Sequence, residues 1–237
     1  VLGGDSGPSG VQEPTRPSTS AVPRPHRGST RAPGRASPIN GPRRTVTDPA
    51  EGFVHLDDRE VHSGRIWSVV VGQFDSPNGV ITRDIVRSPG SVGVLPVLFD
   101  PEGVPSVVLV EQYRPALERE VLEVPAGMRD VVGEAPEETA RRELAEEVGL
   151  SARSIDPLTV IVPSPGMSDA TTHLFLATGC EPVPDSRQGP EEEEMRVVHI
   201  PLSEAVDLVR AGSIVDAKSA VGLLLAADRL HRGDLTH

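Results

Sequence analysis

The sequence predicts an α/β fold in which a mixed sheet carries helices on its faces. Segments rich in β-branched residues come first, between residues 53 and 112. One helical pattern follows at 136–149, and further strand patterns then lead into two more helices. Strands followed by a helix, more strands and further helices are typical of such a covered mixed sheet.

Composition divides the 237 residues into three predicted parts. Residues 1–50 are rich in Pro, Ser, Gly, Thr and Arg, with almost no large apolar side chains. Such a segment cannot bury enough surface to offset its ordering entropy, so we expect a disordered basic tail. A solvated extension is favoured over a docking role. Residues 51–91 should form a small β region, and residues 92–237 the main domain.

The strand patterns in the first half are short and separated by turn residues. A Pro77-Asn78-Gly79 turn joins two of them, and Asp100-Pro-Glu-Gly103 closes a later hairpin. The predicted strands are 53–57, 64–74, 79–87, 92–99 and 107–112.

The second half alternates strand and helix patterns. The last helix carries apolar residues on one face, as expected for a helix that covers a sheet. The predicted strands are 158–162, 173–178 and 197–200, and the predicted helices are 202–211 and 217–232.

The helix predicted at 136–149 has clear ends. Pro136 suits the first turn, where its missing N–H costs nothing, and Gly149 is a natural stop. Residues recurring every four positions form a narrow apolar stripe: Ala140, Leu144 and Val148.

Three carboxylates, those of Glu143, Glu146 and Glu147, share the face beside this stripe. A pair of like charges about 4 Å apart repels by around 4 kcal/mol at an effective dielectric of about 20. A divalent cation would remove that penalty, and hard oxygens are what Mg²⁺ prefers. A solvated acidic face explains the helix alone equally well.

The wider stretch resembles the Nudix box, Gly-x5-Glu-x7-Arg-Glu-U-x-Glu-Glu-x-Gly-U, where U is a bulky aliphatic residue. The matching positions are Gly127, Glu134, Arg142, Glu143, Leu144, Glu146, Glu147, Gly149 and Leu150. Six residues instead of five separate Gly127 from Glu134, which we interpret as one extra residue in the loop before the helix. The resemblance implies a Nudix-type α/β/α sandwich with a mixed sheet for residues 92–237.

Nudix enzymes hydrolyse a nucleoside diphosphate linked to another group, using Mg²⁺ or Mn²⁺. The resemblance implies that Glu143, Glu147 and the Ala126 carbonyl hold the metal. It also implies that Arg142 orients the carboxylates, and that Glu146 is either a metal ligand through water or a hydrogen-bond partner of a ligand; both are candidate catalytic residues. A regulator that binds ADP-ribose without cleaving it would lack box glutamates, which are all present here.

Three further elements resemble the ADP-ribose pyrophosphatase class. Pro165 is the fifteenth residue after Leu150, Gln112-Tyr113-Arg114 matches a Gln-Tyr-Arg element, and Glu123-Val-Pro-Ala-Gly127 matches the lead-in to the box. The resemblance implies that Arg114 contacts the substrate diphosphate, a task that suits a bidentate guanidinium. It also suggests substrate contacts at Pro165, Met167 and Arg65. Each element alone could be structural, and another nucleotide sugar or a damaged nucleotide is the alternative substrate.

The resemblance also suggests a general base in an acidic loop. The run Glu191 to Glu194 follows a Pro-, Asp- and Gly-rich segment. Aligned on the next strand, Glu193 is the candidate metal ligand and Glu191 the candidate base. A solvated loop is the alternative for such a run of like charges.

The resemblance and the composition also suggest partners and location. The strands before residue 92 look like the small β-domain that ADP-ribose pyrophosphatases exchange across a homodimer. Seven Arg against three acids in residues 1–50 leave a net charge of about −16 on the rest, which argues against nucleic acid.

No apolar run nears the roughly 20 residues needed to cross a bilayer, and no secretory signal is evident at residues 1–10. The single cysteine, Cys180, cannot form an internal disulfide. We therefore expect a cytoplasmic protein without a membrane partner.

Overall fold

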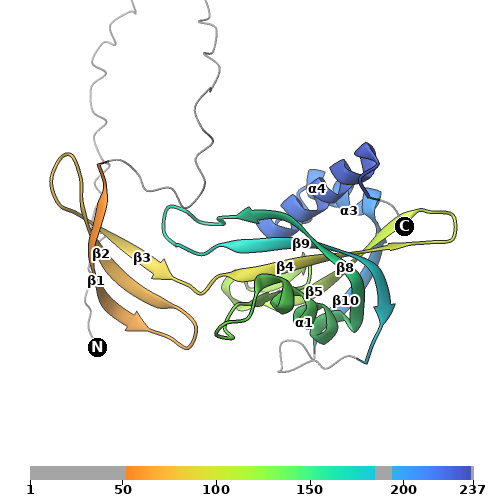
Figure 1. Cartoon of the computed structure of the whole chain (residues 1–237), viewed down its shortest axis with the longest axis horizontal. Helices are drawn as coiled ribbons and strands as arrows, with labels where there is room; N and C mark the ends of the chain where they lie inside the picture. The colour runs from red at the N-terminus through yellow and green to blue at the C-terminus, as the bar shows by residue number, and fades with distance from the viewer. Residues whose placement is uncertain (1–51, 185–193, 236–237) are drawn as a thin grey trace, which may run out of the picture. The chain divides into compact units, whose positions relative to one another are not determined.

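The computed structural model describes residues 52–184 and 194–235 (Figure 1). The first strands form a three-stranded antiparallel sheet in the order β1-β2-β3. Most side chains of β1 are exposed, while Val70 in β2 is buried. The strand bounds are β1 (Val54–Ser63), β2 (Ser68–Asp75) and β3 (Ile81–Arg87).

The larger sheet has seven strands and is mixed, as the sequence predicts. Its main path runs β10-β5-β4-β9-β8, with β6 paired to β5 and β7 paired to β4. The β4–β9 pair is parallel and the other pairs are antiparallel. The bounds are β4 (Ser91–Phe99), β5 (Pro105–Arg114), β6 (Arg119–Glu123), β7 (Ala126–Met128), β8 (Leu150–Ile161), β9 (Thr172–Pro182) and β10 (Arg196–Pro201).

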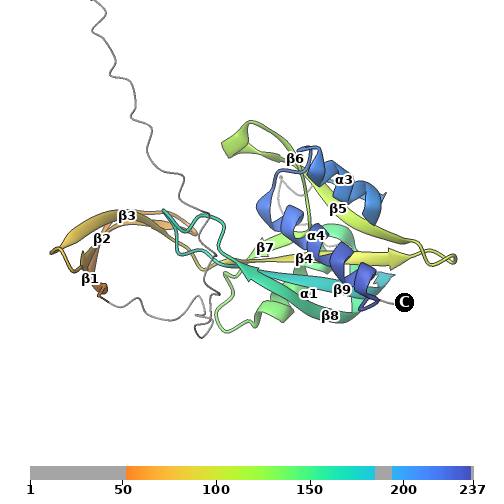
Figure 2. The same cartoon turned by 90° about the horizontal axis from the view of Figure 1, so that it is seen from above.

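Helices cover both faces of this sheet (Figures 1 and 2). On one face α1 (Pro136–Val148) packs on Val94 of β4, and on the other face α3 (Leu202–Arg210) and α4 (Ala217–Arg232) pack on Leu95. Successive strand residues point to opposite faces, so two neighbouring residues of one central strand belong to two different cores. The α/β/α sandwich is therefore confirmed. A short 3-10 helix, η1 (Pro115–Leu117), links β5 to β6.

Several strand bounds differ from the predicted ones. The strand expected at 64–74 begins at Ser68, because the Gly64 N–H donates to the Trp67 carbonyl at 2.8 Å and forms a turn. The strand expected at 158–162 begins at Leu150, immediately after α1, since its first residues alternate between exposed and partly buried positions. The pattern did not reveal it because those residues are mostly small or polar.

Some predicted features lie outside the described residues. These are the tail at residues 1–50 and the two candidate site residues of the acidic run, Glu191 and Glu193. Within residues 52–184 and 194–235, no helix is both long enough and apolar enough to cross a membrane.

Candidate active site

Helix α1 is defined by local interactions at both ends. Its first residue is Pro136, and the Glu138 carboxylate accepts a hydrogen bond from the Ala135 N–H at 3.0 Å, which satisfies a donor just before the first turn. At the other end Gly149 adopts φ 62°, and its N–H donates to the Ala145 carbonyl. These ends fix which side chains of α1 face β7.

Two glutamates of α1, Glu143 and Glu147, are buried although acidic side chains are rarely so. The Glu147 Oε2 accepts a hydrogen bond from the Ala126 N–H of β7 at 2.9 Å. The Glu143 carboxylate lies against the neighbouring residue, Gly127, where a Cβ would overlap it. The two carboxylates thus meet two successive residues of β7, and this contact explains why a glycine suits position 127.

Arg142 joins the acidic residues of the box. Its Nη1 donates to Glu143 Oε1 at 2.8 Å and to Glu146 Oε2 at 3.0 Å, and its Nε donates to Glu134 Oε1 at 3.2 Å. Hydrogen bonds from Arg142 and then Thr139 hold the pKa of Glu134 below its ordinary value. The predicted repulsion between Glu143 and Glu146 is therefore offset by a guanidinium that fixes both.

The residues present fit a hard divalent cation beside β7. Gly127 makes room for the Glu143 carboxylate itself, and Glu147 is held by the N–H of the neighbouring residue, Ala126. Carboxylate and carbonyl oxygens are the ligands that Mg²⁺ and Mn²⁺ prefer. As the described side chains stand, no three His, Cys, Asp or Glu residues converge on one point, and Arg142 occupies the side of Glu143 that faces Glu146.

Arg114, at the end of β5, forms a bidentate pair with Glu123 of β6. Its Nε donates to Oε1 at 2.6 Å and its Nη2 to Oε2 at 2.8 Å. The pKa of Arg114 is raised, first by this hydrogen bond and further by the charge of Glu147. Arg114 is therefore within electrostatic reach of the box carboxylates, and its side chain stays 37% exposed.

An apolar cavity of about 410 Å³ reaches the end of β7. Met128 lines it, and this residue directly follows Gly127 in β7. Met167, from the segment between β8 and β9, and Trp67, which precedes β2, also line it. Met167 additionally lines a smaller hollow together with Pro165, so these two predicted residues do lie together.

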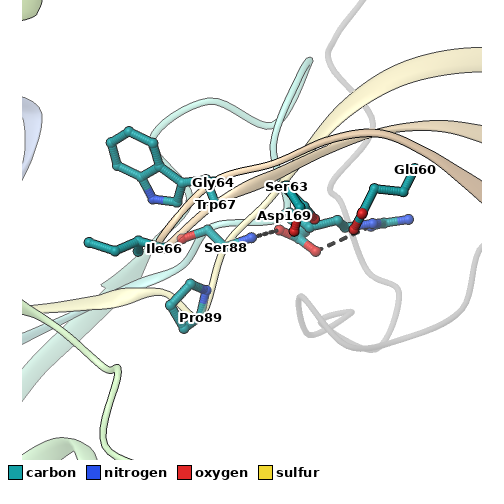
Figure 3. A pocket seen from close by; sticks show the side chains of 10 residues that line it. Glu60, Ser63, Gly64, Ile66, Trp67, Ser88, Pro89 and Asp169 are labelled. Atoms are coloured by element: carbon teal, nitrogen blue, oxygen red, sulfur yellow. Dashed lines mark hydrogen bonds and ion pairs between the residues drawn. The ribbon is translucent and has the colours of Figure 1, made fainter.

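A second, more polar pocket of about 310 Å³ shares Trp67 with the apolar cavity (Figure 3). One wall is built by Arg87, whose guanidinium donates to Asp58 Oδ2 at 2.7 Å and to Asp169 Oδ2 at 3.2 Å. The Ser88 N–H also donates to Asp169, at 3.0 Å. These bonds fasten the segment that carries Met167 to the end of β3.

Among the predicted site residues that the structure describes, Arg65 has the least structural support for a substrate contact. It lies in the exposed turn between β1 and β2, and the three cavities above do not include it in their walls. Its proposed contact with substrate has no geometric support within the described residues.

Sequence reasoning missed four residues near the site. Glu123 was noted only as part of a lead-in motif, although it pairs with Arg114 through two hydrogen bonds. Lys218, the single lysine of the sequence, pairs with Glu123, and no signal in the sequence pointed to this contact. Met128 follows the box glycine directly, and Arg129 carries a buried Nε that has no partner among the described residues.

The sandwich, together with the box glutamates on α1, defines the class of Nudix hydrolases. The comparisons with known proteins agree. The chain belongs to the NUDIX domain family, whose model matches residues 89–218. It is therefore a hydrolase of that family.

The chain is similar to proteins named ADP-ribose pyrophosphatase. It is 37% identical over 165 residues to the one from Bacillus subtilis, covering 69% of this chain and 86% of that protein. It is 36% identical over 173 residues to the one from Mycobacterium tuberculosis, covering 73% and 82%. A solved structure described as an ADP compounds hydrolase matches with a TM-score of 0.64 at 24% identity, covering 80% of this chain and 100% of that one, and shows the fold.

Proposed function

We propose that the protein hydrolyses the diphosphate of ADP-ribose to AMP and ribose 5-phosphate. The observation that carries this proposal is Arg114, which feels the charge of Glu147 and keeps part of its guanidinium open. Two of its N–H groups bind Glu123, and the remaining three have no partner among the described residues. A planar cation held by one edge suits a bidentate contact with a phosphate on the other edge. The names of the relatives support ADP-ribose as the substrate.

In the proposed reaction a water oxygen bonds to one phosphorus, and the bond from that phosphorus to the bridging oxygen breaks. Glu191 is the proposed base that takes the proton of the water, and Glu146 is the next candidate base. When bound, Mg²⁺ or Mn²⁺ would supply positive charge to the diphosphate oxygens. The proposed ligands are the Ala126 carbonyl, Glu143, Glu147 and Glu193. Arg142 orients Glu143 through the hydrogen bond described above.

Strand β7 suggests how the substrate lies. Ala126 meets Glu147, Gly127 meets Glu143, and Met128 lines the apolar cavity. We propose that the diphosphate spans the first two positions, while the nucleoside enters the cavity against Trp67 and Met167. Aromatic and thioether side chains suit a flat ring.

Three further residues are proposed as substrate contacts at the edge of this site. Pro165 would form the outer rim, and Arg65 remains a proposed contact from the N-terminal strands. Arg129 is a further proposed phosphate contact, because its buried Nε lacks a partner among the described residues.

A homodimer is part of the proposal. The three-stranded sheet and the residues flanking its strands expose large apolar side chains, which a second copy could cover. They are Phe53, Val54, Leu56, Val61 and Val80. If residues 1–50 are only an extension, deleting them should leave the dimer and the activity unchanged, as light scattering and initial rates would show.

We also propose a cytoplasmic location, because the only cysteine of the sequence is a free thiol with no partner for an internal disulfide.

The substrate is tested with purified protein, Mg²⁺ and a panel of ADP-ribose, ADP-glucose, GDP-mannose, NADH and 8-oxo-dGTP. We expect the highest kcat/KM for ADP-ribose, with AMP and ribose 5-phosphate formed in equal amounts. Another nucleotide sugar or a damaged nucleotide is the second candidate, since Trp67, Met128 and Met167 are apolar and do not by themselves select one base. A higher kcat/KM for another member of the panel would replace ADP-ribose.

A further inference from the structure

Glu123 is the centre of a buried ion cluster that reaches beyond the box. It lies at the end of β6 and is only 3% exposed. Arg114 of β5 binds it from one side through two hydrogen bonds, and Lys218 of α4 binds Oε2 from the other. Burial alone would raise the pKa of Glu123, but its bonds to Arg114 and Lys218 outweigh burial and lower the pKa. Glu123 is therefore held as a carboxylate between two cations.

Lys218 is itself held by the start of helix α4. Its Nζ lies 3.0 Å from Oδ2 of Asp216, which caps the helix by accepting the Ser219 N–H at 2.9 Å. The Ser219 hydroxyl accepts a hydrogen bond from the Val124 N–H at 2.8 Å. The first turn of α4 is thus tied to the end of β6 through one ion pair and one backbone contact.

The cluster balances two carboxylates against two cations. An ion pair that is buried depends on complete pairing, because removing one partner leaves an uncompensated charge. Arg114 and Glu123 share a planar, two-bond geometry that sets the direction of the guanidinium. Lys218 restrains the same carboxylate oxygen that receives the second of these bonds. The direction of Arg114 therefore depends on a residue of α4.

We propose that Glu123 and Lys218 are positioning residues for Arg114, so that helix α4 is part of the diphosphate-binding machinery. The inference rests on the proposed role of Arg114 as a phosphate contact. Lys218 is the last residue that the family model matches, and the remainder of α4 extends beyond it. Glu123, Asp216 and Lys218 therefore lie within the matched residues, and Ser219, which accepts the Val124 N–H, lies one residue beyond them.

The test measures equilibrium binding of inorganic pyrophosphate and of ADP-ribose by calorimetry, with EDTA present so that metal-dependent turnover does not intervene. Lys218→Met removes the charge and keeps most of the stem. We expect it to weaken pyrophosphate binding about tenfold, as for a lost charge-assisted hydrogen bond. Lys218→Arg should recover most of that loss. Arg232→Met is the matched control, since it removes an exposed cation from the same helix, 2.9 Å from Asp228, and should change nothing.

A double variant shows whether Lys218 acts through Arg114. Arg114→Met alone should weaken pyrophosphate binding, and adding Lys218→Met should weaken it no further. Additive losses, or an unchanged affinity in either single variant, would overturn the inference. If Lys218→Met does not fold, the double variant Glu123→Met with Lys218→Met removes one charge of each sign and keeps the cluster neutral. It should fold, because the Arg114 side chain is 37% exposed and can be solvated. It should still bind pyrophosphate weakly, and wild-type affinity there would also overturn the inference.

The same binding experiment distinguishes failure of the proposed substrate, ADP-ribose, from failure of the proposed role of Lys218. A wild-type protein that binds pyrophosphate but not ADP-ribose would contradict the proposed function, while the comparison of the variants with pyrophosphate would still decide the role of Lys218.

Discussion

The Glu143 carboxylate occupies the space that a Cβ on Gly127 would need. Gly127→Ala should therefore push the carboxylate aside. The displaced group is the end of a flexible side chain, so the loss of stability should stay near the low end of the roughly 1–3 kcal/mol typical of overpacking.

Gly127→Ala should impair metal binding more than it lowers the stability of the fold. Misplacing a ligand or its support typically costs about 10- to 100-fold in metal affinity or activity, and we expect the Mg²⁺ concentration for half-maximal rate to rise accordingly. Gly222→Ala is the control, because no atom lies within 4 Å of a Cβ there. An unchanged Mg²⁺ requirement in Gly127→Ala would argue against Glu143 as a ligand.

Metal binding should stabilise the folded protein. Mg²⁺ or Mn²⁺ should raise Tm in a concentration-dependent way, since a ligand that binds only the folded state stabilises it by mass action. EDTA should abolish turnover. Glu147→Gln should reduce the shift in Tm, whereas Glu137→Gln should not, because Glu137 is an exposed partner of Arg141 on the same helix. Full-rate hydrolysis without metal would contradict the mechanism.

The Glu134–Arg142 pair predicts a pH dependence of stability. The folded protein holds the pKa of Glu134 below the ordinary 4.5, so the unfolded chain takes up a proton first as the pH falls. The stabilising contribution is complete above about pH 4.5 and disappears as the pH falls through the lower folded-state pKa.

Glu134→Gln should therefore destabilise the protein at neutral pH, by less than about 1 kcal/mol for a partly exposed pair. The difference from wild type should shrink below pH 4.5 in urea titrations. A difference that stays constant down to pH 3 would show that the ion pair contributes nothing.

The effects of substituting three adjacent residues of the acidic run can be compared: Glu191, Glu192 and Glu193. If Glu191 is the base, Glu191→Gln should lower kcat by about 10²- to 10⁴-fold. Glu193→Gln should instead raise the metal concentration needed for half-maximal rate, and Glu192→Gln should have almost no effect. Equal and modest effects at all three positions would indicate a solvated loop, and Glu146 would then be the next candidate base.

Cys180 should be an unreactive thiol. Burial raises its pKa to about 11, so little thiolate is present at neutral pH. A thiol reagent at pH 7.5 should label the native protein slowly and the urea-unfolded chain quickly. Rapid labelling of the native protein would show that the thiol is accessible.

Helix α1 was predictable because its signals are local. Pro136 and Gly149 mark its ends within one turn, and the box residues between them keep a fixed spacing. Strands β6 and β7 were not predicted, because each is short and its partner is set by the tertiary fold. Lys218 pairs with a residue 95 positions away, which periodicity in one sequence does not reveal.

The proposed substrate contacts differ in the same way. Pro165 was predicted from its distance to the box and Met167 from its place beside Pro165, and both line one hollow. Trp67 and Met128 line one cavity although they lie 61 positions apart in the sequence, which no local pattern encodes.

The single residue between α1 and β8 has a consequence for local opening. Gly149 follows the last residue of α1, Val148, and Leu150 already begins β8. The Gly149 carbonyl also accepts the Val183 N–H at 2.8 Å, so this junction is tied to the segment after β9. Because a single residue links α1 to β8, the last turn of α1 cannot unfold locally without disturbing the pairing of β8 with β9. Amide hydrogens of that turn should therefore exchange with solvent as slowly as those at the start of β8, unlike the ends of most helices.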